Sequence, residues 1–388
     1  MDTFEECHSV LTKFIASHEG MKQRDEQWKA KLGRTVGGSE LAAITGKNKY
    51  STFYDIVANK INIVNQKYSD ISGLACLWGT LFEDVAAKYV GFLYECEPIG
   101  TEICIMSRPG FRYSPDGYIV GSVKADGTLW KKGEDKSLIK YYQPTLIEIK
   151  CPLRRSPKDI IPLEYAPQVW AGIEFSPSGT RGLFIDVKIR KCRIDQLNSS
   201  ADYDAIHKDS SVQTNCVAWG MIGLFTTTPP ADGINFFTNA SEKDIELLIN
   251  DITNRKIKKF SHVEISDISC DVDATLTKWE KSADLVGAPD IKHYFYGALP
   301  WKIVDIKTID VPAYEGYLDK VAPVVKEVND LVTAAVESQD PNYLANYMKN
   351  VNIQGVAKKA YRLNDKKTFK EHDAMVLEAM GEFPMDFK

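Results

Sequence analysis

Residues 146–151 place two charged side chains in a run that is otherwise apolar enough to lie in a protein core. Successive side chains of a β-strand point to opposite faces, so Glu148 and Lys150 share one face and the neighbouring isoleucines share the other. A buried charge is costly unless it is paired or bound to a metal ion. The strand therefore indicates either a simple Glu–Lys ion pair on an exposed sheet face or a functional site.

A second carboxylate lies at a sharp turn before another predicted strand, in Ser114-Pro115-Asp116-Gly117. Two acids from adjacent strands that converge on one point supply the hard oxygen ligands that Mg²⁺ prefers. A metal ion bound there would activate a water molecule and stabilise negative charge on a phosphate. Lys150 would orient that water or take its proton. We therefore expect Asp116, Glu148 and Lys150 to form the active site of a Mg²⁺-dependent hydrolase, with Mn²⁺ able to substitute.

The chain alternates between helical and strand-like periodicity. Helices are predicted at 1–31, 77–90, 165–175 and about 313–337, and strands at 100–121, 146–151, 182–189 and, as a pair, at 294–311. This alternation predicts an α/β fold with a mixed central sheet flanked by helices. We expect a core with N-terminal helices at 1–199 and an insertion of unknown role at 200–290, with a helix at 241–254. A C-terminal strand pair and helices would follow at 291–388.

Residues 35–44 have the pattern of a helix start, with a Gly-Gly turn followed by Ser39 as the expected N-cap. Free backbone N–H groups at such a helix terminus suit an anion, including a phosphate. The same pattern is also that of an ordinary capped helix.

Composition excludes several classes of protein. The eight cysteines include no CxxC pair, which argues for reduced thiols and against a zinc site or an iron–sulfur cluster. No secretory signal or membrane-spanning run is predicted, so we expect a cytoplasmic or nuclear protein that is not secreted. The net charge of −5 is unusual for a protein that binds nucleic acid. An enzyme that acts on DNA needs only a local basic surface, and the basic stretches at 188–193, 255–259 and 358–370 are candidates for one.

Asp116 followed at a distance by Glu148-Ile149-Lys150 resembles the PD-(D/E)xK nuclease motif. Further blocks match in the same order: Trp28 with 37–40, then 78–83, 114–117, 148–152 and 165–169. Together they are similar to phage lambda exonuclease and the YqaJ-like viral recombinases, including relatives in large DNA viruses. The resemblance spans residues 28–175, and residues 299–302 add a weaker C-terminal likeness.

This resemblance implies a restriction-endonuclease-like core and a role for each matching residue. Asp116 and Glu148 would ligate the metal, with the carbonyl of Ile149 as a third ligand. Glu83 would bind or orient a second metal ion or its water. Ser39, Ser114 and Gln168 would form the pocket for the terminal 5′-phosphate of the digested strand.

The sequence departs from the family pattern where the 5′-phosphate is expected to bind. The family has an arginine seven residues before the serine of this pocket, and here that position is Leu32. Lys31 or a shifted Arg34 would substitute, although a lysine lacks the bidentate fork of arginine. The second glutamine of the family's Q-x-Q pattern is Trp170 here.

The function implied is a 5′→3′ exonuclease on double-stranded DNA ends, acting in viral DNA recombination, repair or genome processing in the host cell. A single-strand annealing protein is an expected partner, and a homo-oligomer is compatible with the family. Two alternatives stay open at this stage. One is a DNA endonuclease on the same core, and the other is a catalytically silent DNA-binding module.

Overall fold

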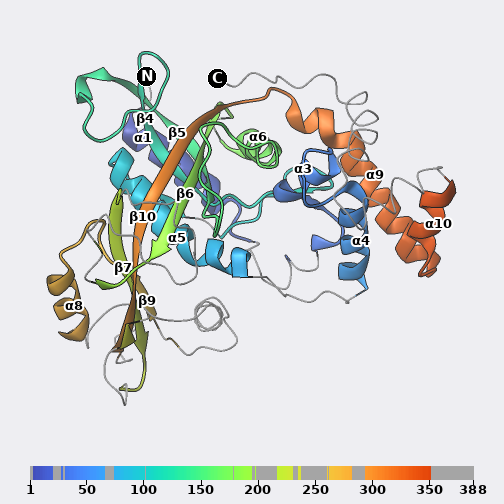
Figure 1. The fold of residues 1–388 in the computed structure, drawn as a ribbon. Coiled ribbons are helices and arrows are strands. Elements are labelled where there is room, and N and C mark those ends of the chain that lie inside the picture. The colour runs from blue at the N-terminus through green and yellow to red at the C-terminus, as the bar shows by residue number, and fades with distance from the viewer. Residues whose placement is uncertain are drawn as a thin grey trace.

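The computed structural model describes residues 3–20, 28, 31–65, 74–100, 102–177, 179–194, 197, 216–229, 235–236, 260, 262–281 and 293–350. In this part of the chain a strongly curved mixed β-sheet is flanked by helices (Figure 1). The predicted α/β class with a mixed central sheet is therefore confirmed. The predicted helix at 241–254 and the basic stretches at 255–259 and 358–370 lie outside the described residues.

The main sheet has the order β2-β4-β5-β6-β10-β7-β9, with β8 beside β10. Its strands are β2 (Ile99–Gly100), β4 (Gly117–Lys124), β5 (Ile139–Lys150), β6 (Arg181–Lys191), β7 (Ala218–Thr226), β8 (Asn235–Phe236), β9 (His262–Ile265) and β10 (Tyr294–Pro312). β5 and β6 run parallel, as do β8 and β10, and the other pairs are antiparallel. A separate parallel pair joins β1 (Val36–Gly37) to β3 (Phe111–Arg112).

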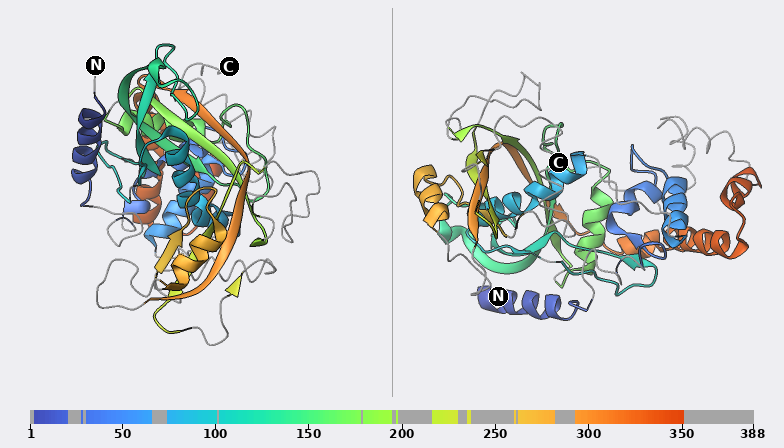
Figure 2. Two further views of the ribbon diagram at one scale, coloured as in Figure 1. Left: turned by 90° about the vertical axis from the view of Figure 1, so that its left-hand side faces the viewer. Right: turned by 90° about the horizontal axis from the view of Figure 1, so that it is seen from below.

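The helices lie on both faces of the sheet and at one end of it. They are α1 (Phe4–Ala16), α3 (Leu41–Ile44), α4 (Phe53–Val64), α5 (Leu74–Tyr94), α6 (Ala166–Phe175), α8 (Val272–Lys281), α9 (Tyr317–Ser338) and α10 (Tyr343–Asn350), with 3₁₀ turns η1 (Gly38–Glu40) and η2 (Lys136–Leu138). α1 and α5 cover opposite faces of the sheet (Figure 2). α3, α4 and α9 pack together beside α6.

Strand β5 is covered on both faces, as its alternating pattern requires. Leu146 belongs to the hydrophobic core that includes α6 and α9, whereas Ile147 and Ile149 belong to the core beneath α5. Glu148 has 0% of its surface exposed. A simple ion pair on an exposed sheet face is thereby excluded, because this carboxylate lies inside the protein.

The predicted strand pair at 294–311 is wrong, since these residues form the single strand β10. Its first half pairs with β7 and its second half with β6, so one long strand joins both neighbours without a turn. A register shift between Phe295 and Gly297 replaces the expected break. Residues 216–229 and 262–265 of the expected insertion contribute β7 and β9 to this same sheet.

The helix predicted after the Gly-Gly turn is shorter than expected. Ser39 is not its N-cap: Ser39 lies within the 3₁₀ turn η1, which Gly37 caps, and Glu40 is the N-cap of α3. The Gly37 N–H donates a hydrogen bond of 2.6 Å to Oε2 of Glu40. The helical segment ends at Ile44, so it is too short for a helix dipole to dominate anion binding.

Candidate active site

Glu148 is held at two points inside the protein. The Tyr113 hydroxyl donates to its Oε2 at 3.0 Å, and the Lys150 ammonium donates to its Oε1 at 2.5 Å. Burial, followed by the negative charge of Asp116, raises the pKa of Glu148 to about 7. A carboxylate in this condition gains from a nearby cation, because a cation offsets both causes of the shift.

Tyr113 is a site residue that the sequence analysis missed. Its hydroxyl reaches Glu148 because Gly172 of α6 leaves the space: a Cβ on Gly172 would lie 2.2 Å from the hydroxyl oxygen. Gly38 leaves similar space beside the ring, where an added Cβ would lie 2.6 Å from Cδ2. Nothing in the sequence around Tyr113 distinguishes it from an ordinary core aromatic, since the hydrogen bond depends on a helix that follows more than fifty residues later.

Asp116 lies at the turn that leads into β4 and faces the end of β5. The antiparallel register pairs Gly117 with Ile147, which brings the turn beside Glu148. The Ile149 N–H donates to Oδ2 of Asp116 at 2.7 Å, and the Lys150 ammonium lies 3.8 Å from the same oxygen. Two acids from adjacent strands thus converge as predicted. The carbonyl of Ile149 as a metal ligand stays a prediction, because the observed contact is made by its N–H.

Glu83 approaches this cluster from α5. Burial, followed by repulsion from Asp116, raises the pKa of Glu83 to about 8, while the positive charge of Lys150 opposes the shift. The residue before Glu83 is tied to the segment that follows β5, since the Cys151 thiol donates to the carbonyl of Phe82 at 3.5 Å. The structure therefore brings Glu83, which is distant in sequence, within electrostatic range of the two strand acids.

Lys150 is the cation at the centre of these acids. Burial alone would lower the pKa of its ammonium group, but the charges of Glu148 and Asp116 outweigh burial and raise it. A lysine whose pKa is raised keeps its proton at neutral pH, so it is a poor acceptor for a proton from water. Of the two roles predicted for Lys150, orienting the water fits this environment better than taking its proton.

A pocket of about 590 Å³ adjoins the acidic cluster. Ser39, Ser114, Gln168 and Asp116 all line it, although they come from η1, the turn before β4 and helix α6. The structure thus brings together the three residues predicted for a phosphate pocket. Asp116 belongs to both the pocket and the carboxylate cluster, which joins the two into one site.

Lys31 and Arg34, the two predicted substitutes for the family's arginine, are both exposed and do not line this pocket. The turn at 31–35 explains this, because the Arg34 N–H and the Thr35 hydroxyl both donate to the carbonyl of Lys31. Leu32 is the residue of this turn that lies in the pocket wall, with 6% of its surface exposed. Neither substitute is therefore placed to touch a phosphate in the pocket.

The donor types of the acidic cluster fit a hard divalent cation. Asp116, Glu148 and Glu83 supply carboxylate oxygens, which a hard divalent cation prefers. The raised pKa values of the two glutamates reflect burial first and then repulsion from Asp116. Among the described residues, no three or more His, Cys, Asp or Glu side chains are already grouped as metal ligands. The chemistry of the donors, rather than a preformed coordination shell, supports a metal.

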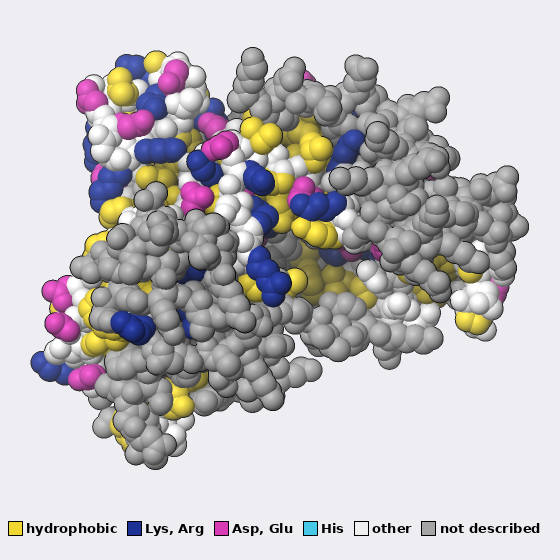
Figure 3. Space-filling view, in the orientation of Figure 1, with side chains coloured by type: hydrophobic (Ala, Val, Ile, Leu, Met, Phe, Trp, Pro, Cys, Tyr) yellow, Lys and Arg dark blue, Asp and Glu magenta, His cyan; other side chains and the backbone are white. Residues whose placement is uncertain are grey.

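Lys and Arg side chains gather in the middle of the face seen in Figure 3, beside a hollow in the surface. Acidic side chains lie among them, so this is not a uniformly basic surface. The predicted basic stretch at 188–193 does not supply such a surface, because Lys188, Arg190 and Lys191 are buried in β6. None of the helices in the described part of the chain is both long and apolar enough to cross a membrane.

Residues 26–175 match the model of the YqaJ-like viral recombinase domain. Over this range the chain is similar to the YqaJ-like viral recombinase domain. Each of the ten residues predicted for the site falls within the matched range, as do Tyr113 and the pocket described above. The resemblance inferred from the ordered sequence blocks is confirmed, and the domain match with its carboxylate cluster indicates a nuclease.

Proteins of African swine fever virus are similar to this chain beyond the YqaJ-like domain. One, from the Badajoz strain, is 26% identical over 322 residues, which cover 80% of this chain and 86% of the viral protein. A second, from a South African tick isolate, is 27% identical over 323 residues with the same coverage. The names of these relatives state no activity.

Solved structures are also similar to this chain. The alkaline exonuclease of Laribacter hongkongensis is 19% identical, with a TM-score of 0.28, and the match covers 42% of this chain and 74% of that one. The Shutoff and Exonuclease Protein of Kaposi's sarcoma-associated herpesvirus is 12% identical, with a TM-score of 0.26. That match covers 88% of this chain and 77% of the herpesvirus protein.

Proposed function

We propose that this protein is a metal-dependent deoxyribonuclease that digests double-stranded DNA from its ends in the 5′→3′ direction. The observation that carries the proposal is the junction at Asp116, where a cluster of acids with one lysine meets a pocket lined by hydroxyl and amide groups. The first part suits phosphodiester hydrolysis and the second suits a terminal phosphate. Such an enzyme would act in viral DNA recombination, and a single-strand annealing protein would be its natural partner.

Asp116 and Glu148 would hold the metal ion, with Glu83 binding or orienting a second ion or its water. Mg²⁺ is the proposed ion and Mn²⁺ its substitute. When bound, a divalent cation supplies a water molecule of lowered pKa and positive charge beside the phosphate.

The chain's own residues position the reacting groups. The Tyr113 hydroxyl and the Ile149 N–H hold Glu148 and Asp116 in place. The Lys150 ammonium neutralises the phosphate and orients the attacking water. A P–O bond forms to water and the bond to the 3′ oxygen breaks, so a nucleotide leaves with a 5′-phosphate and a free 3′ hydroxyl. The next nucleotide then carries the new 5′-phosphate.

Binding of Mg²⁺ is expected to depend steeply on pH. The pKa values of Glu148 and Glu83 are about 7 and about 8, so both are largely protonated at pH 6. A metal ion needs deprotonated ligands, so its apparent affinity should rise from pH 6 to pH 8.5, by up to about tenfold per pH unit for each proton released. Calorimetry in buffers of different ionisation enthalpy counts these protons. Proton release near pH 6.5 that vanishes by pH 9 agrees with the assignment, whereas an affinity that is flat with pH contradicts it.

The experiment that tests the proposed function compares a linear duplex with a covalently closed circle in the presence of Mg²⁺. The linear duplex carries a label at either the 5′ or the 3′ terminus. We expect only the linear substrate to be lost, with the 5′ label released first. Cutting of the circle would instead indicate an endonuclease on the same core. Binding of both substrates without cleavage would indicate a DNA-binding module and would overturn the proposal.

A further inference from the structure

The pocket beside Asp116 needs a positive charge if it is to hold a terminal phosphate, which carries close to two negative charges at neutral pH. Its serine and glutamine side chains are neutral, and Leu32 occupies the position where the family carries an arginine. Among the described residues that line the pocket, Arg112 is the one cationic side chain. Arg112 stands two residues before Ser114 and was not singled out in the sequence.

Arg112 reaches the pocket from strand β3. The parallel pairing of β1 with β3 sets Gly37 opposite Arg112, and the guanidinium lies against the backbone of this glycine. A Cβ added to Gly37 would lie 2.4 Å from Nη1, closer than any normal contact. The backbone of Gly37 has φ −82° and ψ 156°, which any residue can adopt. Gly37 is therefore required here for the space that it leaves to the guanidinium.

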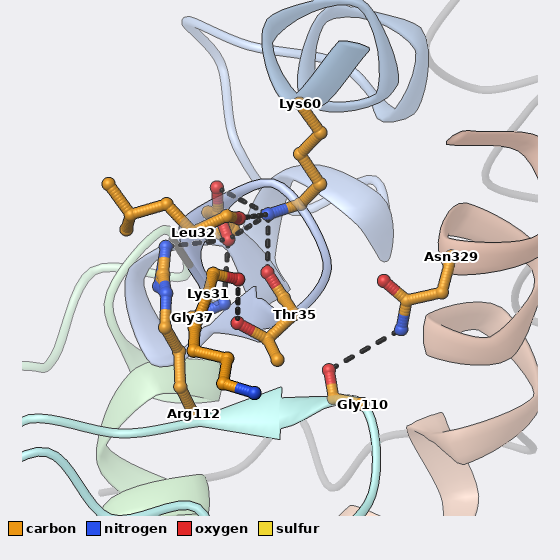
Figure 4. Close-up of polar contacts among 9 residues, drawn as sticks. Lys31, Leu32, Thr35, Gly37, Lys60, Gly110, Arg112 and Asn329 are labelled. Atoms are coloured by element: carbon orange, nitrogen blue, oxygen red, sulfur yellow. Dashed lines mark hydrogen bonds and ion pairs between the residues drawn. The ribbon is translucent and has the colours of Figure 1, made fainter. Parts of the chain in front are cut away.

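Glu40 orients the guanidinium and is itself held by a buried lysine. Its Oε2 accepts a hydrogen bond of 3.2 Å from Nη2 of Arg112. Lys60, with 0% of its surface exposed, donates to both oxygens of Glu40, at 2.9 and 3.0 Å. Lys60 extends from α4 and Arg112 from β3 toward this one carboxylate (Figure 4).

The ammonium of Lys60 has no capacity left for a ligand. Besides Glu40 it donates to the carbonyl oxygens of Leu32 at 3.2 Å and Thr35 at 2.6 Å. These three acceptor groups match the three protons of an ammonium group. Lys60 therefore serves as the internal counter-charge of Glu40, and with two cations against one carboxylate the cluster keeps one net positive charge.

The guanidinium of Arg112 still has donors to offer. Its Nε is buried and has no hydrogen-bond partner, although arginine carries five N–H donors in a fixed fork. The indole of Trp28 lies 5.8 Å from the guanidinium carbon and covers it further. A buried N–H without a partner costs free energy, and a bound anion would remove that cost. Arg112, the residue that carries this unpaired donor, lines the pocket.

We propose that Arg112 binds the terminal 5′-phosphate of the DNA strand and supplies, from strand β3, the charge that Leu32 lacks. The inference rests on the proposed function. The guanidinium of Arg112 would bind the phosphate together with the hydroxyls of Ser39 and Ser114, one nucleotide from the acidic cluster. Glu40 and Lys60 are positioning residues that aim the guanidinium without touching the DNA.

The test measures kcat/KM on duplexes that differ only in a 5′-phosphate or a 5′-hydroxyl. Arg112→Ala is expected to reduce the preference for the phosphorylated end by about 10- to 100-fold. This fold-change corresponds to the loss of one hydrogen bond to a charged group. Arg112→Lys should recover part of the preference, because it keeps the charge but not the fork. Gly37→Ala should also reduce it, since the added methyl group displaces the guanidinium while every charge stays.

Two further arginines serve as comparisons. Arg108 forms an ion pair of 2.7 Å with Asp319 and does not line the pocket, so Arg108→Ala should leave the preference unchanged. Arg34→Ala tests the competing assignment. Loss of the preference in Arg34→Ala with retention in Arg112→Ala would overturn the inference. So would an unchanged preference in all three Arg112 and Gly37 variants, each checked for a native melting temperature.

A binding measurement separates failure of this inference from failure of the proposed function. Duplexes with either end are titrated into Glu148→Gln protein, alone and combined with Arg112→Ala, so that no turnover is needed. Tighter binding of the phosphorylated end that disappears with Arg112→Ala supports the inference even if the wild-type protein proves inactive. Cleavage by the wild-type protein without any preference for the phosphorylated end would overturn the inference but would still support the proposed nuclease activity.

Discussion

Replacing Glu148 by glutamine is expected to abolish DNA cleavage. Glutamine keeps the shape of the side chain and an oxygen that can accept from the Tyr113 hydroxyl, but it loses the negative charge. Loss of a metal-binding carboxylate removes several kcal/mol of transition-state stabilisation, about 10³-fold or more in rate. Folding should persist, because the variant replaces a buried carboxylate whose pKa is already raised to about 7.

Single-turnover cleavage of a 5′-phosphorylated duplex in Mg²⁺ measures this loss. DNA binding by Glu148→Gln should be at least as tight as that of the wild-type protein, because the variant removes a negative charge that repels the phosphate. Glu337→Gln, on an exposed position of α9, is the matched control and should be fully active. Undiminished cleavage by Glu148→Gln would show that the acidic cluster is not the catalytic centre.

Replacing Lys150 by methionine is expected to slow cleavage by about 10²- to 10⁴-fold, the range typical of a lost catalytic side chain. Methionine keeps much of the length and apolar volume of the lysine stem but removes its charge. The ammonium of Lys150 lowers the pKa values of both Glu148 and Glu83, so its removal should raise them further. Both carboxylates then hold their protons to higher pH.

This second effect distinguishes a charge role from a purely structural one. Cleavage rates of Lys150→Met and the wild-type protein are compared from pH 6 to pH 10 at saturating Mg²⁺. The rising limb of the profile should move to higher pH in the variant, in addition to the loss of rate. Lys150→Arg keeps the charge and should leave the limb close to its wild-type position. A variant limb that moves to lower pH would contradict the assigned role.

Asp116, Glu148 and Lys150 were predictable from local signals, whereas Glu83 was expected only from the family resemblance. The alternation of residues 146–151 placed Glu148 and Lys150 on one strand face, and the turn sequence before β4 placed Asp116 at the end of a strand. The mixed sheet and the helices α5 and α6 followed from periodicity in the same way. In each of these cases the information lies within a few consecutive residues.

The partners that orient the cluster and its pocket were not predictable in this way. Tyr113 reaches Glu148 only because Gly172 of a later helix leaves space for its hydroxyl. Arg112 enters the pocket through the register of β1 with β3, which joins segments more than seventy residues apart. A buried lysine such as Lys60 carries no local signal either, since its burial depends on the carboxylate of Glu40.

The predicted strand pair was wrong, and Lys31 and Arg34 do not line the pocket; both outcomes have a physical cause. Two strands were predicted within 294–311, but pairing on both sides holds β10 as one strand. Lys31 and Arg34 were chosen for their nearness in sequence to Leu32. The turn at 31–35 buries Leu32 and leaves the two basic side chains exposed. Nearness in sequence to Leu32 therefore did not predict which basic side chain reaches the pocket.

The most direct test of metal-dependent DNA hydrolysis at this site is the release of acid-soluble nucleotides from a linear 5′-phosphorylated duplex. The wild-type protein is assayed in Mg²⁺ and in EDTA, with Glu148→Gln assayed in Mg²⁺. We expect release by the wild-type protein in Mg²⁺ alone. Release in EDTA, equal release by Glu148→Gln, or no release by the wild-type protein in Mg²⁺ would each contradict the account.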